Sequence, residues 1–320
     1  MEKKSTYKPN TAISIYELFQ IFPNEEVARK YLEEERWKGI PTCPHCKSQK
    51  TGTPRGNKGY HNGYYRCKDC RKEFCVKTST IFACSNIPLN KWFVAFYYMV
   101  TARKGISTLQ LSKELGITQK SAWLLEMKIR YAMSSDKYKY LLENDVEIDE
   151  TYFGGKEGNK HSKKKLKQGR GSVGKTPVFG AVQRNGNAFA FVMPEVKKRI
   201  IQTVLPFIVK QGSTIHTDEG THYKGIEDLG YKRKSVNHSA KLFVKGDSYT
   251  NTIEGVWALM KRGYYGTFHW FSKKHTQSYV NEFIFRWNSG NCKYKTMDRI
   301  DSLLAGCWDM IMPYKLLIMS

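Results

Sequence analysis

Cys43-Pro-His-Cys46 and, twenty residues further on, Cys67-Lys-Asp-Cys70 form two CxxC pairs. A CxxC turn presents two thiolates side by side, and two such turns supply the four ligands of a tetrahedral Zn²⁺ ion. The segment between the pairs contains three tyrosines that favour a β-hairpin: Tyr60, Tyr64 and Tyr65. Residues 41–84 are therefore predicted to form a zinc ribbon, and the zinc would be structural because four thiolates leave no open position. A disulfide pair or free thiols are the alternative.

The sequence also bears on where the chain works and on the state of its eight cysteines. The N-terminus has no apolar signal segment, and the longest apolar run, Trp92–Val100, is half the length of a membrane span. We therefore expect an intracellular, cytoplasmic protein without a membrane partner, whose thiols stay reduced. Four cysteines lack a partner at ligand spacing and are expected to be buried and inert: Cys75, Cys84, Cys292 and Cys307.

Helical periodicity flanks the cysteine-rich segment on both sides. Upstream, residues 1–40 contain apolar positions that predict one helix over about Ile15–Trp37. Downstream, residues 85–133 are predicted to be helical, with Pro88 near a helix start and Gly105 as a stop.

The stretch from Ser107 to Met133 has the pattern of a helix–turn–helix. Ser107 and Gln110 match a capping box at the start of the first helix. Gly116-Ile117 would make the turn, and Thr118 would cap the second helix. The polar residues that open this second helix are Gln119, Lys120 and Ser121, and they are predicted to contact DNA bases. An αα-hairpin that only packs is the alternative.

Residues 145–290, which follow a linker at 134–144, alternate short β-type runs with helices, as α/β domains do. Strands are predicted at about 145–150, 176–184, 187–194 and 213–217, and helices near 196–210, 252–262 and 275–287. Residues 291–320 are treated as a C-terminal tail. The predicted fold class is thus multidomain: a zinc ribbon, a helix–turn–helix segment and an α/β core.

The charge balance indicates a polyanionic partner. Lys and Arg number 53 against 29 Asp and Glu, a surplus of 24 positive charges. Such an imbalance favours nucleic acid as the partner. The loop Lys156–Lys175 carries eight basic residues and one acid. Four of its cations are predicted to contact DNA phosphates: Lys163, Lys164, Lys165 and Arg170.

The same loop contains Gly169-Arg-Gly-Ser-Val-Gly174-Lys175-Thr176, which matches the P-loop expression GxxxxGK[ST]. A P-loop needs a strand before it and a helix after it, so that amide groups meet the phosphates. Here a polar basic run precedes the match, and Pro177 and a strand-like run follow it. We therefore predict that the chain does not bind ATP.

Three acidic residues stand where an α/β core could bring them together. Asp149 ends the strand-like run Val146–Asp149, Asp218 follows another run, and Glu254 lies near the start of a predicted helix. Carboxylates placed in this way can hold a pair of Mg²⁺ ions for phosphoryl transfer. Lys261 lies two helical turns after Glu254 and could hold a DNA backbone beside the metals. Spacing alone leaves solvated carboxylates as the alternative.

Taken together, these motifs resemble one family, the zinc-ribbon insertion-sequence transposases of prokaryotes, of the ISXO-like branch related to eukaryotic Merlin elements. The likeness covers about residues 20–290 and includes, besides the cysteine pairs, Ile117-Thr-Gln-Lys-Ser-Ala-Trp123, Ile148-Asp149-Glu-Thr-Tyr-Phe-Gly-Gly-Lys156, Thr217-Asp218-Glu-Gly and Asn251-Thr-Ile-Glu254-Gly-Val-Trp257. The resemblance implies an RNase H-like core with a mixed five-stranded sheet. It also implies that Asp149, Asp218 and Glu254 bind the metals.

The resemblance implies a DNA transposase that cuts the ends of its element and joins them to target DNA. Two Mg²⁺ or Mn²⁺ ions would serve catalysis, and the partners would be the terminal inverted repeats and target DNA. Because two ends must meet, a homo-oligomer on DNA is expected, working at the nucleoid in a prokaryotic cytoplasm. A non-catalytic DNA-binding regulator and a nuclease without strand transfer are the alternatives.

Overall fold

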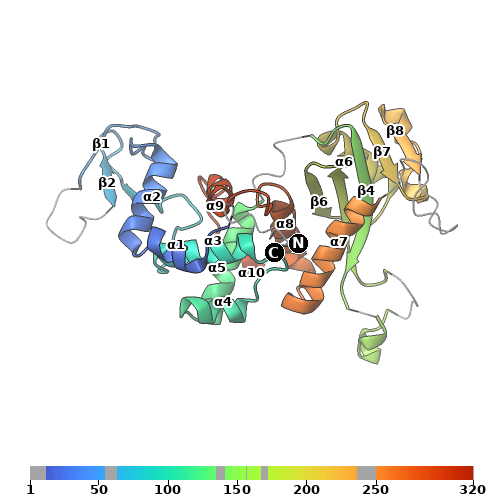
Figure 1. The fold of residues 1–320 in the computed structure, drawn as a ribbon, viewed down its shortest axis with the longest axis horizontal. Coiled ribbons are helices and arrows are strands. Elements are labelled where there is room, and N and C mark those ends of the chain that lie inside the picture. Colours follow the sequence, from blue (N-terminus) through green and yellow to red (C-terminus); the bar gives the residue numbers. More distant parts are fainter. Residues whose placement is uncertain are drawn as a thin grey trace, which may run out of the picture. The chain divides into compact units, whose positions relative to one another are not determined.

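The computed structural model describes residues 12–54, 63–134, 141–155, 157–166, 172–235 and 250–319. The chain divides into two compact units, one of residues 1–102, 106–133 and 289–320 and one of residues 103–105 and 134–288 (Figure 1). In the part of the chain that is described, no helix is long and apolar enough to span a membrane.

The first unit begins with two helices where the sequence predicts one. Helix α1 spans Ile15–Ile21 and α2 spans Glu25–Trp37. The single helix was wrong because Pro23 disfavours helical geometry at the residue before it. The side chain of Asn24 then caps α2 by accepting the amide N–H of Val27 at 3.0 Å.

The cysteine-rich segment forms a three-stranded antiparallel sheet. Its strands are β1 (Thr51–Gly52), β2 (Tyr64–Cys67) and β3 (Glu73–Cys75), in the order β1-β2-β3. The predicted hairpin therefore corresponds to β1 and β2. Tyr60, which entered that prediction, lies outside the described residues.

The rest of the first unit is helical. Helices α3 (Leu89–Thr101), α4 (Thr108–Leu115) and α5 (Gln119–Ala132) follow the ribbon, and α3 is buried along most of its length. The segment treated as a tail contains α9 (Thr296–Ala305) and α10 (Tyr314–Met319). Helix α9 packs against α3, and Arg299 donates a hydrogen bond to the carbonyl of Val100 at 2.9 Å.

The second unit is built on a five-stranded sheet of order β6-β5-β4-β7-β8. The strands are β4 (Asp145–Phe153), β5 (Thr176–Gln183), β6 (Ala188–Val192), β7 (Thr214–Thr217) and β8 (Lys232–Ser235). Strands β4, β5 and β6 pair antiparallel, whereas β7 runs parallel to β4 and β8 parallel to β7. The core is thus the mixed sheet of an RNase H-like domain. The residue patterns did not predict β8, because a short edge strand with three cations lacks alternation.

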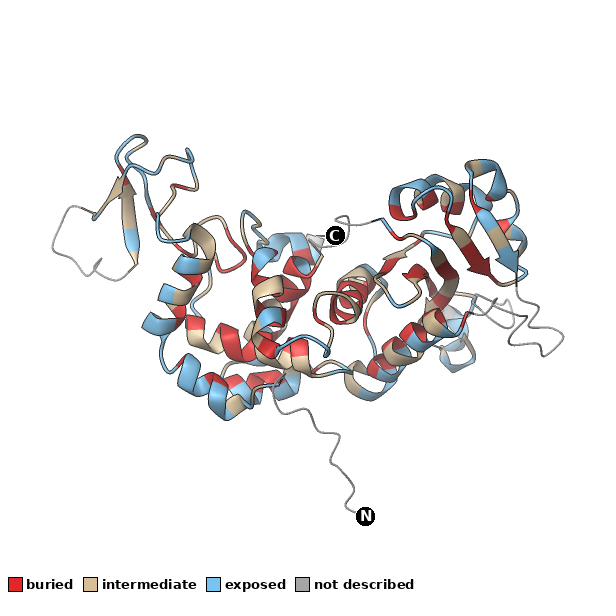
Figure 2. Cartoon of the chain, turned by 45° about the horizontal axis from the view of Figure 1, so that its top comes forward, coloured by how far each residue is buried: buried red, intermediate tan, exposed pale blue. Residues whose placement is uncertain are grey.

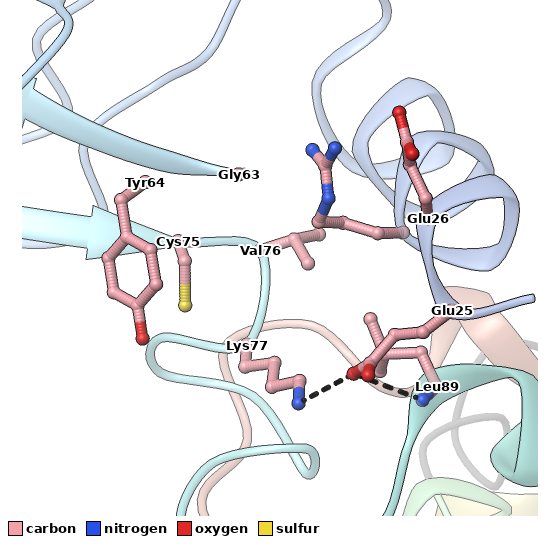
Figure 3. A pocket seen from close by; sticks show the side chains of 9 residues that line it. Glu25, Glu26, Gly63, Tyr64, Cys75, Val76, Lys77 and Leu89 are labelled. Atoms are coloured by element: carbon pink, nitrogen blue, oxygen red, sulfur yellow. Dashed lines mark hydrogen bonds and ion pairs between the residues drawn. The ribbon is translucent and has the colours of Figure 1, made fainter. Parts of the chain in front are cut away.

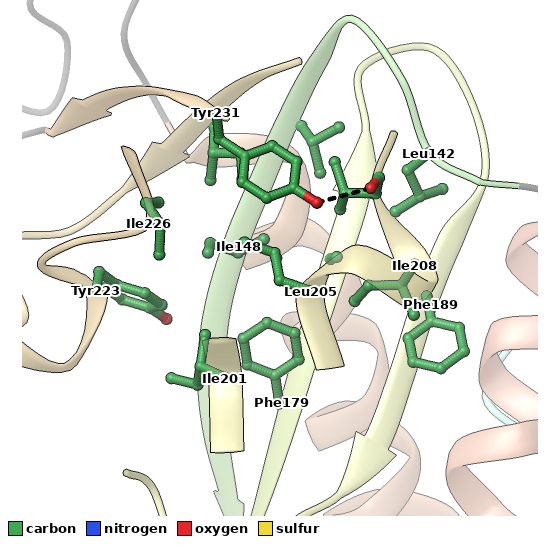
Figure 4. Packing of buried hydrophobic residues seen from close by; sticks show 14 of the residues in the cluster. Leu142, Ile148, Phe179, Phe189, Ile201, Leu205, Ile208, Tyr223, Ile226 and Tyr231 are labelled. Atoms are coloured by element: carbon green, nitrogen blue, oxygen red, sulfur yellow. Dashed lines mark hydrogen bonds between the residues drawn. The ribbon is translucent and has the colours of Figure 1, made fainter. Parts of the chain in front are cut away.

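Helices cover both faces of this sheet. On one face, α6 (Lys198–Ile208) contributes Ile201, Leu205 and Ile208 to a core that includes Ile148 of β4 (Figure 4). On the other face, α7 (Asn251–Gly263) and α8 (Thr276–Trp287) pack on Phe153, Val178 and Val182. Buried positions accordingly follow the central strands and the inward faces of the helices (Figure 2). Successive side chains of β4 therefore face opposite cores.

Candidate functional site

The two CxxC pairs meet in space. The Sγ atoms of Cys43, Cys46, Cys67 and Cys70 all lie within 4.8 Å of one another. Cys43 and Cys70 are 3.7 Å apart at sulfur, and Cys46 and Cys67 are 3.5 Å apart. Zinc–sulfur bonds of about 2.3 Å in a tetrahedron require sulfur separations of about 3.8 Å, whereas a disulfide requires about 2.0 Å. The cluster therefore fits a structural zinc ion and excludes the disulfide alternative for these four residues.

The ribbon holds this cluster through local and long-range packing. Cys43 and Cys67 are buried together with Phe74, and Trp37 at the end of α2 packs against them. The amide of Cys70 hydrogen-bonds to the sulfur of Cys67 and lowers the pKa of that thiol, whereas the pKa of Cys46, whose sulfur shares a hydrogen bond with Cys67, is raised.

The other four cysteines correct part of the sequence analysis. Cys307 is buried as expected, and burial raises the pKa of its thiol. Cys84 and Cys292 are exposed, and Cys75 is partly exposed. They are not buried because Cys84 and Cys292 lie in turns and loops rather than on inward faces of elements. Cys75 ends β3 and lines a hollow of about 330 Å³ beside α2, where Lys77 pairs with Glu25 at 3.3 Å (Figure 3).

The strand that carries Asp149 is longer than predicted: β4 pairs with β5 as far as Phe153, so Asp149 lies in the middle of this strand and not at its end. Asp218 directly follows the last residue of the neighbouring strand β7. Strands β4 and β7 pair in parallel up to Glu147 and His216. Continuing this register by two residues aligns Asp149 with Asp218, on strands about 4.8 Å apart. The Asp149 carboxylate lies on the face that α7 covers, and the charge of Asp218 is near enough to act on it.

The electrostatics of Asp149 reflect this proximity. Burial, together with the negative charges of Glu150 and Asp218, raises the pKa of its carboxyl to about 7. Among the described residues, no lysine or arginine forms an ion pair with Asp149 or Asp218. No described lysine or arginine therefore offsets the charge of these two acids by an ion pair, and such a setting suits a bound cation.

Helix α7 contacts Asp149 directly. The indole Nε1 of Trp257 donates a hydrogen bond to Oδ2 of Asp149 at 3.0 Å. The ring fits because Gly180 lies opposite Asp149 on β5, where a Cβ atom would stand 2.3 Å from the Trp257 ring. Glycine at this position therefore allows the helix to approach the strand that carries Asp149.

A buried carboxylate fixes the start of α7. Glu147, fully buried on β4, accepts hydrogen bonds from the amides of Thr252 and Ile253 at 2.8 and 3.0 Å. It also accepts from the Thr252 hydroxyl at 2.9 Å and pairs with Arg184 at 2.9 Å. Thr250, the N-cap residue, supplies no side-chain cap. Glu147 therefore caps helix α7 from strand β4, a role that the sequence analysis missed.

The third predicted acid lies on this helix. Glu254 is exposed and accepts a hydrogen bond from the Thr250 hydroxyl at 3.3 Å. It precedes Trp257 by three residues, so both side chains project from one side of α7. Lys261, also exposed, lies at the far end of the helix. Among the described residues, the four cysteines are the one group whose possible ligand atoms all lie within 4.8 Å of one another. The carboxylate oxygens of Asp149, Asp218 and Glu254 therefore do not all lie within this distance of one another.

Three residues beside the acidic pair were missed by the sequence analysis. Glu150 accepts a hydrogen bond from the hydroxyl of buried Tyr223, and Nε2 of His222 lies 3.1 Å from the same carboxylate. This contact raises the pKa of His222. In the sequence, only the position of Glu150 next to Asp149 indicated a role for one of these three residues. Its partners His222 and Tyr223 lie on a short helix after Asp218 (Thr221–Tyr223), far from Glu150 in the sequence.

The predicted helix–turn–helix residues lie on α4 and α5, which pack on each other. Ser107 caps α4, Gly116 ends it in the left-handed region at φ 57°, and Thr118 caps α5. Gln119 and Lys120 are exposed at the start of α5, and Ser121 is partly exposed. The Lys120 ammonium lies 5.4 Å from the ring of Tyr314.

The basic loop is described in part. Lys163 and Lys164 belong to a short 3₁₀ helix (Ser162–Lys164), and Lys163 and Lys165 are exposed. Arg170 lies outside the described residues, as does Gly169 at the start of the P-loop match. Strand β5 begins at Thr176, where a P-loop would begin its helix.

A cysteine cluster suited to zinc and an RNase H-like mixed sheet are the two parts that the resemblance to zinc-ribbon insertion-sequence transposases predicts. Sequence comparison agrees. Residues 141–288 match the ISXO2-like transposase domain, and residues 23–73 match the transposase zinc-ribbon domain. The chain belongs to the insertion-sequence transposases that combine these two domains.

Individual relatives point the same way. An uncharacterised protein in the transposable element ISH50 of Halobacterium salinarum is 29% identical over 252 residues, covering 75% of this chain and 83% of that protein. An uncharacterised transposase-like protein of Haemophilus influenzae is 26% identical over 105 residues, covering 33% of this chain and 84% of that protein.

Solved structures match at a lower level. A pre-cleavage Mos1 transpososome and the Mos1 strand transfer complex share 13% and 14% identity with this chain, each with a TM-score of 0.29. The matches cover 67% and 66% of this chain and 77% and 74% of those chains. Such scores are too low to bear on the site.

Proposed function

We propose that this transposase binds the terminal inverted repeats of its element, cleaves DNA strands there and joins the freed ends to target DNA. The observation that carries the proposal is the acidic pair Asp149 and Asp218, which has no ion-paired lysine or arginine among the described residues, together with the contact between Asp149 and the helix that carries Glu254. Hard oxygen donors of this kind suit Mg²⁺ or Mn²⁺. When bound there, two such ions would stabilise the attacking and leaving oxygens of an in-line displacement at phosphorus.

The protein groups divide the remaining work. Asp149 and Asp218 would hold the metals from the sheet and Glu254 from the helix. Trp257 would keep the Asp149 carboxylate in one orientation, and Glu147 would keep α7 against β4. Buried hydrogen bonds restrict the rotation of the side chains that they join. These contacts would therefore hold the metal-binding carboxylates in position before DNA binds.

DNA would be held by cations of the second unit and by the first unit. Lys261 on α7 and the lysines of the basic loop, Lys163, Lys164 and Lys165, would contact phosphates, together with Arg170. Gln119, Lys120 and Ser121 would read the terminal repeats from the exposed start of α5. Two ends joined in one reaction require an oligomer on DNA, and the working location would be the nucleoid of a prokaryotic cytoplasm.

The decisive experiment compares wild type with Glu254→Gln in binding and strand-cleavage assays run with Mg²⁺. The amide keeps the volume of the side chain but is a poorer metal ligand, so cleavage should fall by about two orders of magnitude or more while affinity for the DNA end stays unchanged. Glu219→Gln, exposed and next to Asp218, is the matched control and should cleave like wild type.

Each other outcome has a defined meaning. Cleavage that persists in Glu254→Gln removes this residue from the active site. Wild-type binding without cleavage indicates the DNA-binding regulator instead. Cleavage without joining in a strand-transfer assay indicates a nuclease.

A further inference from the structure

A turn rich in aromatic residues follows α7 and has no role in the function proposed above. We call Tyr264–Phe271 the aromatic turn. It begins with a π-helical turn over Tyr264–Phe268. Irregular helical turns of this kind often mark functional positions.

The aromatic turn has an inner side that is firmly packed. Tyr264 and Phe271 are buried, and their rings lie 4.7 Å apart at the centroids. Phe271 stacks on Tyr279 of α8 at 4.4 Å, and Tyr264 lies 5.5 Å from Phe153 of β4. The turn is therefore anchored on the sheet and on α8, and its backbone position is fixed by the core.

Its outer side presents two large rings to solvent. Tyr265 is 65% exposed and Trp270 is 64% exposed. Between them, His269 adopts φ 58°, a conformation that residues with a side chain rarely take. This residue turns the chain so that Trp270 projects outward while Phe271 enters the core. Nδ1 of His269 lies 3.0 Å from the carbonyl of Tyr265 and ties the turn together.

Cations flank the aromatic turn in the sequence. Lys261 and Arg262 precede the turn and Lys273 and Lys274 follow it, and all four are exposed. No ion pair links any of the four to an acidic side chain in the described ranges. The sequence contains no acidic residue from Gly255 to Asn281. The surface is therefore positively charged as well as aromatic.

We infer that the aromatic turn binds unpaired nucleotides of DNA, with Trp270 and Tyr265 stacking on bases and the four cations contacting phosphates. This inference rests on the proposed action on DNA. Exposed aromatic faces stack on unpaired bases of any sequence, whereas bases in a duplex are covered by their neighbours. The turn lies about 16 Å along α7 from Glu254, a length of about five base steps, so a strand cleaved at the metal site could reach it.

The test uses a short DNA duplex of random sequence, either blunt or with a single-stranded tail that contains 2-aminopurine. Wild type should bind the tailed duplex more tightly than the blunt one and should quench the 2-aminopurine fluorescence by stacking. Trp270→Ala and Tyr265→Ala should each lose affinity for the tailed duplex by about fivefold or more and keep affinity for the blunt one. Trp270→Phe should restore much of the loss.

Phe207→Ala is the control, because Phe207 is 73% exposed on α6 and lies outside the aromatic turn. It should bind both duplexes like wild type. Equal affinity of Trp270→Ala and wild type for the tailed duplex overturns the inference. So does a loss of self-association in Trp270→Ala, measured by light scattering, with tail binding unchanged, which would make the turn a contact between copies of the chain.

The inference and the proposed function fail in different ways. If blunt-duplex binding and Glu254-dependent cleavage are present but the tail adds nothing, only the inference is wrong. If wild type binds neither duplex and also fails to bind a duplex of the terminal-repeat sequence, both are wrong.

Discussion

At the residue scale, Glu147 has a structural role that its neighbours in the sequence do not indicate. It is fully buried and accepts from two helix amides and one hydroxyl while it pairs with Arg184. Removing one partner of a buried network leaves the remaining polar groups buried without a hydrogen-bond partner. The resulting loss in the free energy of unfolding is larger than the net stabilisation that the intact network provides. The start of α7, and with it Glu254, depends on this one carboxylate.

Replacing Glu147 with Ala should therefore lower the free energy of unfolding of the second unit by about 3–5 kcal/mol. Glu143→Gln is the control, because the exposed pair of Glu143 with Lys210 at 3.2 Å should contribute about 0–1 kcal/mol. Urea unfolding curves measure both values. A Glu147→Ala curve that coincides with wild type would show that α7 is held by its apolar face alone.

Asp149 gives a stability effect of opposite sign. Its pKa is about 7 in the folded chain, above the ordinary value of 3.8. Below pH 4 the group is protonated in both states and costs nothing. Between pH 4 and 7 the unfolded chain loses the proton first, so wild-type stability falls as pH rises, and the loss is complete above pH 7.

Asp149→Asn cannot ionise and keeps an acceptor for Trp257. Without added Mg²⁺ or Mn²⁺, it should be more stable than wild type by about 1–3 kcal/mol at pH 8, and the difference should vanish towards pH 4. Thermal unfolding across this pH range measures it. Added Mg²⁺ should stabilise wild type but not the variant. A variant that is less stable than wild type at pH 8 would contradict the cause given for the raised pKa.

At the scale of elements, the ribbon depends on its metal. Strands β1, β2 and β3 comprise nine residues together with a small core, too little apolar surface to fold alone. Zinc binding by the four cysteines would supply the missing free energy.

Cys46→Ser and Cys70→Ser should each lose bound zinc and unfold the ribbon. Cys84→Ser is the control, since Cys84 is exposed and lies outside the cluster. Metal analysis and circular dichroism of the purified proteins test this. Less than about half an equivalent of zinc per wild-type chain would argue against a structural zinc.

At the scale of the whole molecule, the proposed reading and cutting of DNA belong to different units. Helix α5 lies in the first unit, and the acids lie in the second. Variants in α5 should therefore change which DNA is bound without changing the stability of the catalytic unit.

Replacing Gln119 with Ala should cost about 1–3 kcal/mol on a subset of sequences if it contacts a base edge. Replacing Lys120 with Ala should weaken binding to all sequences alike and lower the salt slope by about one. Lys113→Ala, an exposed cation on α4, is the control. Affinities measured over a range of salt separate these effects. If the double variant binds terminal-repeat and random DNA like wild type, α5 serves packing alone.

The local patterns predicted most of the elements correctly because their signals lie within a few residues. Ser107, Gly116 and Thr118 cap or end their helices as predicted. The apolar runs of β4, β5 and β7 became strands because both their faces are buried. Pro23 was a local signal as well, and the prediction of one helix through it was an error of interpretation rather than a lack of information.

What the sequence determined by itself is the group of residues whose chemistry depends on spacing, the four cysteines at ligand spacing. What only the tertiary structure decided is how distant residues meet. Glu147 caps a helix that begins more than a hundred residues later, and Trp257 reaches Asp149 only because Gly180 leaves room. These contacts depend on strand order and register, which bring distant positions together through the packing of the whole domain rather than through any local pattern.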